Sequence, residues 1–178
     1  IWPLHNYGSI YINALKTNEG NSPNADRMVK FAAALKKTTA ATAAVDLAPF
    51  IDLKRMAENL AVYLTVGHWD GPFTFRCWDA WCINNNYYLY DEPNGKIAMI
   101  PWDLDNTLFI KPPTLSTDFW TKKPASCAPI EPCKFFGSTP CPPTTPSSYK
   151  INPVPCDQLL NMAVATNKAA YRAMLAKL

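Results

Sequence analysis

Apolar residues recur at helical spacing in three parts of this chain, so three amphipathic helices are predicted. The first helix follows Ser22-Pro23, an N-cap with a proline in the first turn, and its tail over residues 38–44 is expected to fray. The second begins after Asp52, a good N-cap, and ends near Gly67. The third lies at the end of the chain. The three apolar faces consist of Met28, Phe31, Ala32 and Leu35; of Met56, Leu60, Tyr63 and Leu64; and of Tyr171, Met174, Leu175 and Leu178.

A β-hairpin is predicted between the second and third helices. Its strands cover Asn86–Tyr90 and Lys96–Pro101, and Glu92-Pro93-Asn94-Gly95 is a strong turn signal between them. Residues 72–84, which precede the hairpin, are predicted to form a loop. Since strands favour aromatic residues, we expect the aromatic side chains here to lie in the core. They are Tyr87, Tyr88, Tyr90, Trp102 and Phe109. The pattern as a whole predicts an α+β fold that is mostly helical with a small β-hairpin.

Composition narrows the class of protein. The 178 residues suffice for one domain, 1–178, with a sizeable core. Charged residues make up 17% and the net charge is +3 without a dense basic run, which disfavours a nucleic-acid partner. No apolar run is long enough for a transmembrane segment. The chain begins at Ile1 without a methionine or signal peptide, so we expect a processed chain or part of a longer one.

The cysteines predict an oxidising, extracellular compartment. Their number is even and four lie within thirty residues, which favours disulfides. The chain has no CxxC pair of the kind that zinc sites usually contain, although metal ligation and free thiols remain alternatives. Cys77 and Cys82 form the simplest local disulfide, and the other four cysteines allow three pairings. Because residues 111–156 also hold most of the prolines, we predict a long disulfide-stapled loop there. The six cysteines are Cys77, Cys82, Cys127, Cys133, Cys141 and Cys156.

Carboxylates and amides in the window 68–109 suggest phosphoryl transfer. Protein kinases use the same order around their metals: an aspartate, a metal-binding asparagine, a hairpin and a metal-binding aspartate. Asp70 suits the role of orienting a hydroxyl, and Asn85 or Asn86 suits one metal ligand. Asp103 suits a bridging metal ligand, and Asp105 joins the metal site or caps the next segment. Because paired strands place their open ends side by side, the hairpin should bring Asn86 close to Asp103.

Each of these residues also has a simpler interpretation. An aspartate before glycine, as at Asp70, is usually a turn residue, and asparagine-rich stretches usually mark loops. The Asp103–Asp105 pair could cap a helix or bind structural calcium. A lone histidine such as His68 is more often structural. The combination of residues, rather than any one of them, favours the phosphoryl-transfer hypothesis.

Three segments resemble the CotH kinase family, named after spore coat protein H. They are His68-Trp69-Asp70-Gly71, Asn85-Asn86-Tyr87-Tyr88-Leu89-Tyr90 and Ile100-Pro101-Trp102-Asp103-Leu104-Asp105. The resemblance runs, with gaps, from about residue 24 to the C-terminus. It implies an atypical protein-kinase-like C-terminal lobe that phosphorylates secreted or coat proteins on Ser or Thr with ATP and Mg²⁺ or Mn²⁺. It also implies that Asp70 is the catalytic aspartate and that Asp103, with Asn85 or Asn86 beside it, binds metal and nucleotide.

The chain departs from the family pattern in ways that keep two hypotheses open. It shows no segment resembling the family's N-terminal half with its phosphate-contacting lysine, His68 stands where asparagine is usual, and an insertion separates Asp70 from Asn85. The first hypothesis is a secreted kinase lobe that acts on a protein substrate and needs an N-terminal lobe from upstream sequence. The second is a catalytically silent structural or adhesive component of a coat, cell wall or extracellular filament, with an assembly partner.

Overall fold

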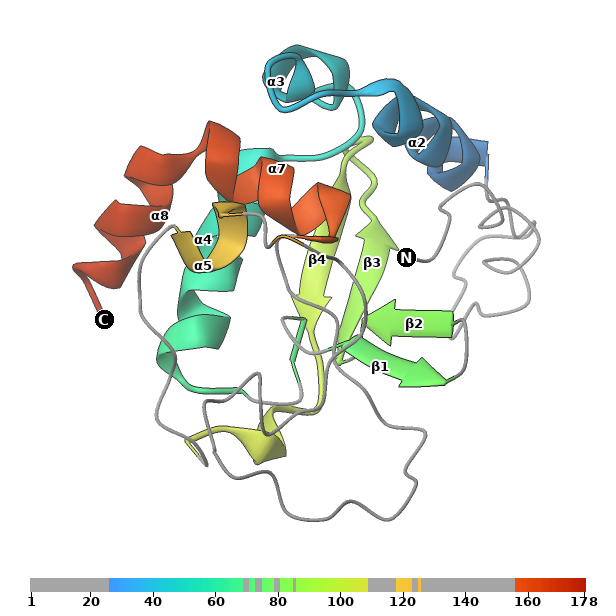
Figure 1. Ribbon diagram of the computed structural model, residues 1–178. Helices are drawn as coiled ribbons and strands as arrows, with labels where there is room; N and C mark the ends of the chain where they lie inside the picture. Colours follow the sequence, from blue (N-terminus) through green and yellow to red (C-terminus); the bar gives the residue numbers. More distant parts are fainter. Residues whose placement is uncertain are drawn as a thin grey trace.

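The computed structural model combines helices with two small antiparallel sheets, which confirms the α+β class (Figure 1). It describes residues 26–68, 71–72, 75–78, 81–84, 86–108, 118–122, 125 and 156–178. The helices are α2 (Asp26–Lys37), α3 (Ala43–Asp46), α4 (Leu53–Thr65), α5 (Asp118–Thr121), α7 (Gln158–Thr166) and α8 (Lys168–Leu175), with a short 3-10 helix η2 (Leu104–Asn106). The strands are β1 (Phe75–Trp78), β2 (Trp81–Asn84), β3 (Tyr87–Asp91) and β4 (Ile97–Pro101).

Helix α4 is the centre of the packing, with contacts to α7, α8 and β4 (Figure 1). It begins as predicted, because the Asp52 carboxylate accepts a hydrogen bond of 3.0 Å from the Arg55 backbone N–H. It ends near Gly67 as predicted, since Gly67 adopts a left-handed φ of 59°. Its predicted apolar face is buried, with side chains exposed by no more than 2%. Those side chains are Met56, Leu60, Tyr63 and Leu64.

The first predicted apolar face is also buried, on α2, but the segment after this helix differs from the prediction. Helix α2 ends at Lys37, and the Thr38 hydroxyl donates a hydrogen bond of 2.9 Å to the carbonyl of Ala34. Instead of a frayed tail, the chain then turns and forms α3. The prediction was wrong here because burial of Ala43 and Leu47 in the core fixes a second short helix.

Strands β3 and β4 form the predicted hairpin, with Tyr87 opposite Pro101 and Leu89 opposite Met99. The turn also agrees: the Gly95 N–H donates to the Glu92 carbonyl over 2.9 Å, and Gly95 has a φ of 86°. The Asn59 amide of α4 donates to the Met99 carbonyl over 3.3 Å. The hairpin therefore lies with one face against α4 (Figure 1).

Residues 72–84 are not simply a loop, because β1 and β2 form a second antiparallel hairpin within them. Cys77 and Cys82 are Cα partners in its register, so the pair proposed from sequence lies on adjacent strands. Cys156 is buried and disulfide-bonded. Cys127, Cys133 and Cys141 lie outside the described residues. The stapled loop and the pairing of the cysteines therefore stay predictions.

The C-terminal segment forms two helices that pack on α4. Asp157 caps α7 by accepting a hydrogen bond of 2.7 Å from the Leu160 N–H. Tyr171 of α8 is buried as predicted, but Leu178, which lies beyond the end of α8 at Leu175, is 59% exposed. Among the helices that the structure describes, none is long and apolar enough to cross a membrane.

Candidate functional site

Three segments that are distant in sequence meet at the C-terminal end of α4. The Tyr63 hydroxyl donates a hydrogen bond of 3.2 Å to the Asn86 carbonyl, at the start of β3. The Trp102 N–H, just after β4, donates to the same carbonyl over 3.1 Å. Near η2, the Leu108 N–H donates to the Val66 carbonyl over 2.6 Å. We call the region bounded by these residues the α4 corner.

The backbone of the α4 corner is strained. Asn86, Asp103 and Leu108 have φ values of 57°, 54° and 62°, and no other non-glycine residue in the described ranges has a positive φ. Asparagine and aspartate tolerate this conformation better than other side chains, whereas leucine there is an outlier. Such residues persist only where the surrounding structure holds them, and they gather at functional sites. The strain therefore marks the α4 corner as a candidate site.

The predicted approach of Asn86 and Asp103 is borne out by the backbone, because Asn86 bonds to Trp102, the residue before Asp103. The Asp103 side chain is exposed, and it makes no capping hydrogen bond although it occupies the N-cap position of η2. Asp105 is exposed within η2. Asp70 and Asn85 lie outside the described residues, so their placement stays a prediction. Among the residues that the structure describes, no group of three or more His, Cys, Asp or Glu side chains could hold a metal.

His68, which precedes Asp70 by two residues, is fully buried at the same corner. Its ring stacks on Tyr63 with the centroids 5.5 Å apart and the planes at 15°. Its carbonyl accepts a hydrogen bond of 2.9 Å from the Gly71 N–H. A Cβ added at Gly71 would lie 2.7 Å from the His68 ring, so only glycine fits there. This burial agrees with the structural interpretation of His68.

Sequence reasoning placed Tyr63 in a helical apolar face and missed its polar contacts. The burial of its phenol raises the pKa of Tyr63 well above the usual range, although the nearby Trp102 backbone N–H acts in the opposite direction. The hydroxyl is therefore a neutral donor at physiological pH. Helical periodicity could not have revealed this role, since it reports which face is buried and not what a buried hydroxyl meets.

The expectation that the hairpin aromatics lie in the core was wrong for three of them. Tyr88, Tyr90 and Trp102 are exposed by 37%, 44% and 57%, and Ile100 beside them by 40%. Tyr87, in contrast, packs against the core, and Phe109 lies outside the described residues. Successive side chains point to opposite faces of a strand, and in this two-stranded sheet only one face meets α4. The Tyr88 and Trp102 rings meet edge to face at 5.3 Å on the outer face.

A family comparison agrees with these motifs. The model of the CotH kinase protein family matches residues 6–128, more than half of the chain. The chain belongs to the CotH kinase family. The match begins earlier than the resemblance noted from residue 24, and it does not include the C-terminal helices α7 and α8. Neither a curated protein nor a solved structure matches the chain significantly.

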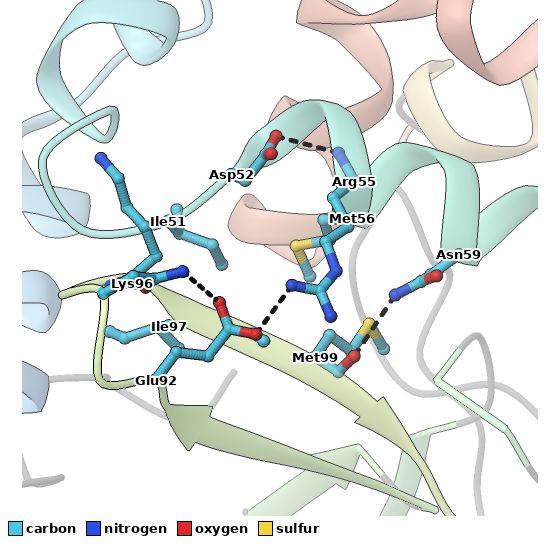
Figure 2. A pocket seen from close by; sticks show the side chains of 11 residues that line it. Ile51, Asp52, Arg55, Met56, Asn59, Glu92, Lys96, Ile97 and Met99 are labelled. Atoms are coloured by element: carbon cyan, nitrogen blue, oxygen red, sulfur yellow. Dashed lines mark hydrogen bonds and ion pairs between the residues drawn. The ribbon is translucent and has the colours of Figure 1, made fainter.

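In this CotH-family chain, a hollow lies away from the α4 corner, between α4 and the hairpin turn (Figure 2). It has a volume of about 90 Å³. Arg55 of α4 donates a hydrogen bond of 2.8 Å to the Glu92 carboxylate, which also accepts one from the Asn94 amide. These bonds, chiefly the one from Arg55, lower the pKa of Glu92. On the other side of the turn, Arg27 of α2 pairs with Asp91 at 3.1 Å. These paired charges fasten the hairpin turn to two helices.

Proposed function

We propose that this CotH-family chain is the C-terminal lobe of a secreted protein kinase. The reaction is transfer of the γ-phosphoryl group of ATP to a Ser or Thr hydroxyl of an extracellular or coat protein. The observation that carries this proposal is the strained backbone where the ends of β3 and β4 meet. There the carbonyl of left-handed Asn86 accepts a hydrogen bond from the N–H of Trp102, the residue before left-handed Asp103. Backbone strain held in place beside an exposed carboxylate favours a metal and phosphate site over a plain turn.

The side chains available at the α4 corner fit a hard divalent cation. Asp103 and Asp105 offer carboxylate oxygens and Asn86 an amide oxygen, which are the donors that Mg²⁺ and Mn²⁺ prefer. Asn85 adds a second amide next in sequence. When bound, ATP would supply the transferable phosphoryl group, and the divalent cation would neutralise the negative charge of the phosphates.

Asp70 is assigned the other half of the chemistry. Its carboxylate would orient the attacking hydroxyl and accept the hydroxyl proton as the new oxygen–phosphorus bond forms and the bond from the γ-phosphorus to the leaving ADP breaks. Asp70 follows two residues after His68, whose ring stacks on Tyr63 of α4, and Tyr63 also donates a hydrogen bond to the Asn86 carbonyl at the start of β3. A phosphate-contacting lysine would come from a separate or upstream N-terminal lobe.

The direct test is transfer of labelled phosphate from ATP with Mn²⁺, scored as autophosphorylation and on a mixed Ser/Thr acceptor protein. Asp103→Asn removes one negative charge at the proposed metal site, and Asp70→Asn removes the proposed proton acceptor. Asp46→Asn makes the same change at an exposed carboxylate of α3 and serves as the control. We expect phosphate transfer to fall at least 100-fold in the first two variants and to be unchanged in the control. Stabilisation of the transition state by a metal ion is worth several kcal/mol. Transfer that survives Asp103→Asn would refute the proposal.

The alternative is a structural or adhesive component without catalysis, and the outer face of the hairpin favours it. Four large side chains are exposed there together: Tyr88, Tyr90, Ile100 and Trp102. Contiguous exposed apolar side chains commonly mark interaction surfaces. Absence of transfer and of Mn²⁺ binding, combined with self-association that Trp102→Ser abolishes in sedimentation experiments, would favour this alternative.

A further inference from the structure

We propose that Tyr63 is a positioning residue that sets His68 and Gly71, the residues flanking the Trp69-Asp70 step in sequence, relative to the strand ends carrying Asn86 and Asp103. This inference rests on the proposed function. Tyr63 is a buried helical residue that contacts both parts of the site. Its ring and its carbonyl contact His68, and its hydroxyl contacts Asn86 at the strand ends.

On the metal side, the Tyr63 hydroxyl holds a carbonyl rather than a side chain. The Asn86 carbonyl accepts hydrogen bonds from the Tyr63 hydroxyl at 3.2 Å and from the Trp102 N–H at 3.1 Å. A carbonyl oxygen has two lone pairs, so these two donors can satisfy it fully. Together they fix the peptide plane after Asn86 and help to keep its left-handed φ of 57°. That backbone sets the direction of the Asn86 Cα–Cβ bond.

On the turn side, Tyr63 acts through its own backbone and ring. Its carbonyl accepts a hydrogen bond of 3.2 Å from the His68 N–H, and the Gly67 N–H donates to the Leu64 carbonyl over 3.1 Å. These two bonds, with Gly67 left-handed, form a Schellman motif that ends α4. The Tyr63 ring then stacks on the buried His68. His68 in turn bonds to Gly71, so both residues that flank the Trp69-Asp70 step are tied back to Tyr63.

The two parts of the contact should be separable by mutation. Tyr63→Phe keeps the ring and the backbone bonds but deletes the hydroxyl, so it should loosen only the strand ends. Tyr63→Leu also deletes the stack on His68 and should additionally disturb Asp70. Tyr171→Phe is the matched control, because Tyr171 is equally buried and its hydroxyl accepts a hydrogen bond of 2.7 Å from Trp120, but it lies on α8.

The experiment compares these variants with wild type in the full-length protein. Mn²⁺ binding is measured by electron paramagnetic resonance, and the Mn²⁺ half-saturation and kcat by phosphate transfer. For Tyr63→Phe we expect weaker Mn²⁺ binding by about 10-fold, as for other residues that orient metal ligands, with the KM for the acceptor protein unchanged. The Trp102 amide should also exchange its hydrogen faster. Tyr63→Leu should lower kcat further, and Tyr171→Phe should change neither quantity.

Two outcomes separate the inference from the function on which it rests. If wild type binds Mn²⁺ and transfers phosphate but Tyr63→Phe behaves like Tyr171→Phe, Tyr63 is only a packing residue and the inference is wrong. If wild type neither binds Mn²⁺ nor transfers phosphate, the proposed function fails, and the positioning role fails with it. Thermal denaturation of each variant checks that it is folded at the assay temperature.

Discussion

Gly71→Ala tests how tightly Gly71 packs against His68. A Cβ at residue 71 would lie 2.7 Å from His68 Cδ2, 2.8 Å from the His68 carbonyl oxygen and 3.1 Å from His68 Cγ. Carbon atoms pack at about 3.5–4.0 Å, so the closest contact is too short by about 1 Å. The ring cannot easily retreat, because His68 is buried and stacked on Tyr63. The carbonyl cannot turn away without breaking its bond to the Gly71 N–H.

The expected cost follows from this overpacking. Forcing an extra methyl group into a packed site destabilises a protein by about 1–3 kcal/mol. For a chain of this size, about 2 kcal/mol corresponds to a fall in Tm of roughly 4–8 °C. Urea denaturation followed by circular dichroism measures the free energy of unfolding, and a thermal scan measures Tm. Since Asp70 adjoins this residue, phosphate transfer should fall as well.

A double-mutant cycle tests the cause. His68→Ala removes two of the three close atoms, so Gly71→Ala should cost less in that background than in wild type. Gly95→Ala is a useful comparison. Its added Cβ would meet the far end of the Arg27 side chain, at 3.0 Å, so the loss of stability should arise chiefly from the positive φ of this residue. A Gly71→Ala variant within about 0.5 kcal/mol of wild type, the range of ordinary surface substitutions, would refute the reasoning.

Two further predictions concern the C-terminal helices. Asn161→Ala removes a buried amide that donates to the Trp120 and Thr121 carbonyls at 3.0 and 3.4 Å. We expect the free energy of unfolding, measured by urea denaturation, to fall by about 1–3 kcal/mol and tryptophan emission to shift. Unchanged stability would contradict this prediction. Burial raises the pKa of Tyr171 from 10.0 to about 12, against the lowering effect of Trp120. The folded state therefore favours the protonated phenol, a stabilisation present below pH 10.0 and lost as the pH rises towards about 12. Tyr171→Phe should make the loss of stability over that window shallower, and an equally steep loss in urea denaturation would exclude this assignment.

The local elements of this protein were largely predictable. Asp52 and Gly67 bound α4 because a carboxylate can cap free N–H groups and glycine can adopt a positive φ, both of which are properties of single residues. The turn at Glu92–Gly95 set the register of β3 and β4 for the same reason. That register, in turn, made the approach of Asn86 to Asp103 predictable from the amino-acid sequence.

Predictions failed where contacts between residues distant in sequence determine the local structure. Residues 72–84 resemble a loop in sequence because their pairing into β1 and β2 depends on cross-strand partners rather than on a strong turn signal. Tyr88 and Trp102 were expected in the core because aromatic content does not tell which face of a hairpin another element covers. The positive φ of Leu108 had no sequence signal, since it is held by a bond to the end of α4.

The sequence by itself determined the family, the helices, the hairpin and the order of the residues that could carry chemistry, because caps, turns and motifs act over a few neighbouring positions. Only the tertiary structure decided that Tyr63 touches both the His68 turn and the Asn86 carbonyl. It likewise decided that Gly71 is confined by His68 and that one aromatic face of the hairpin stays open. These features depend on how α4 lies against the hairpin, and that packing joins residues more than twenty positions apart.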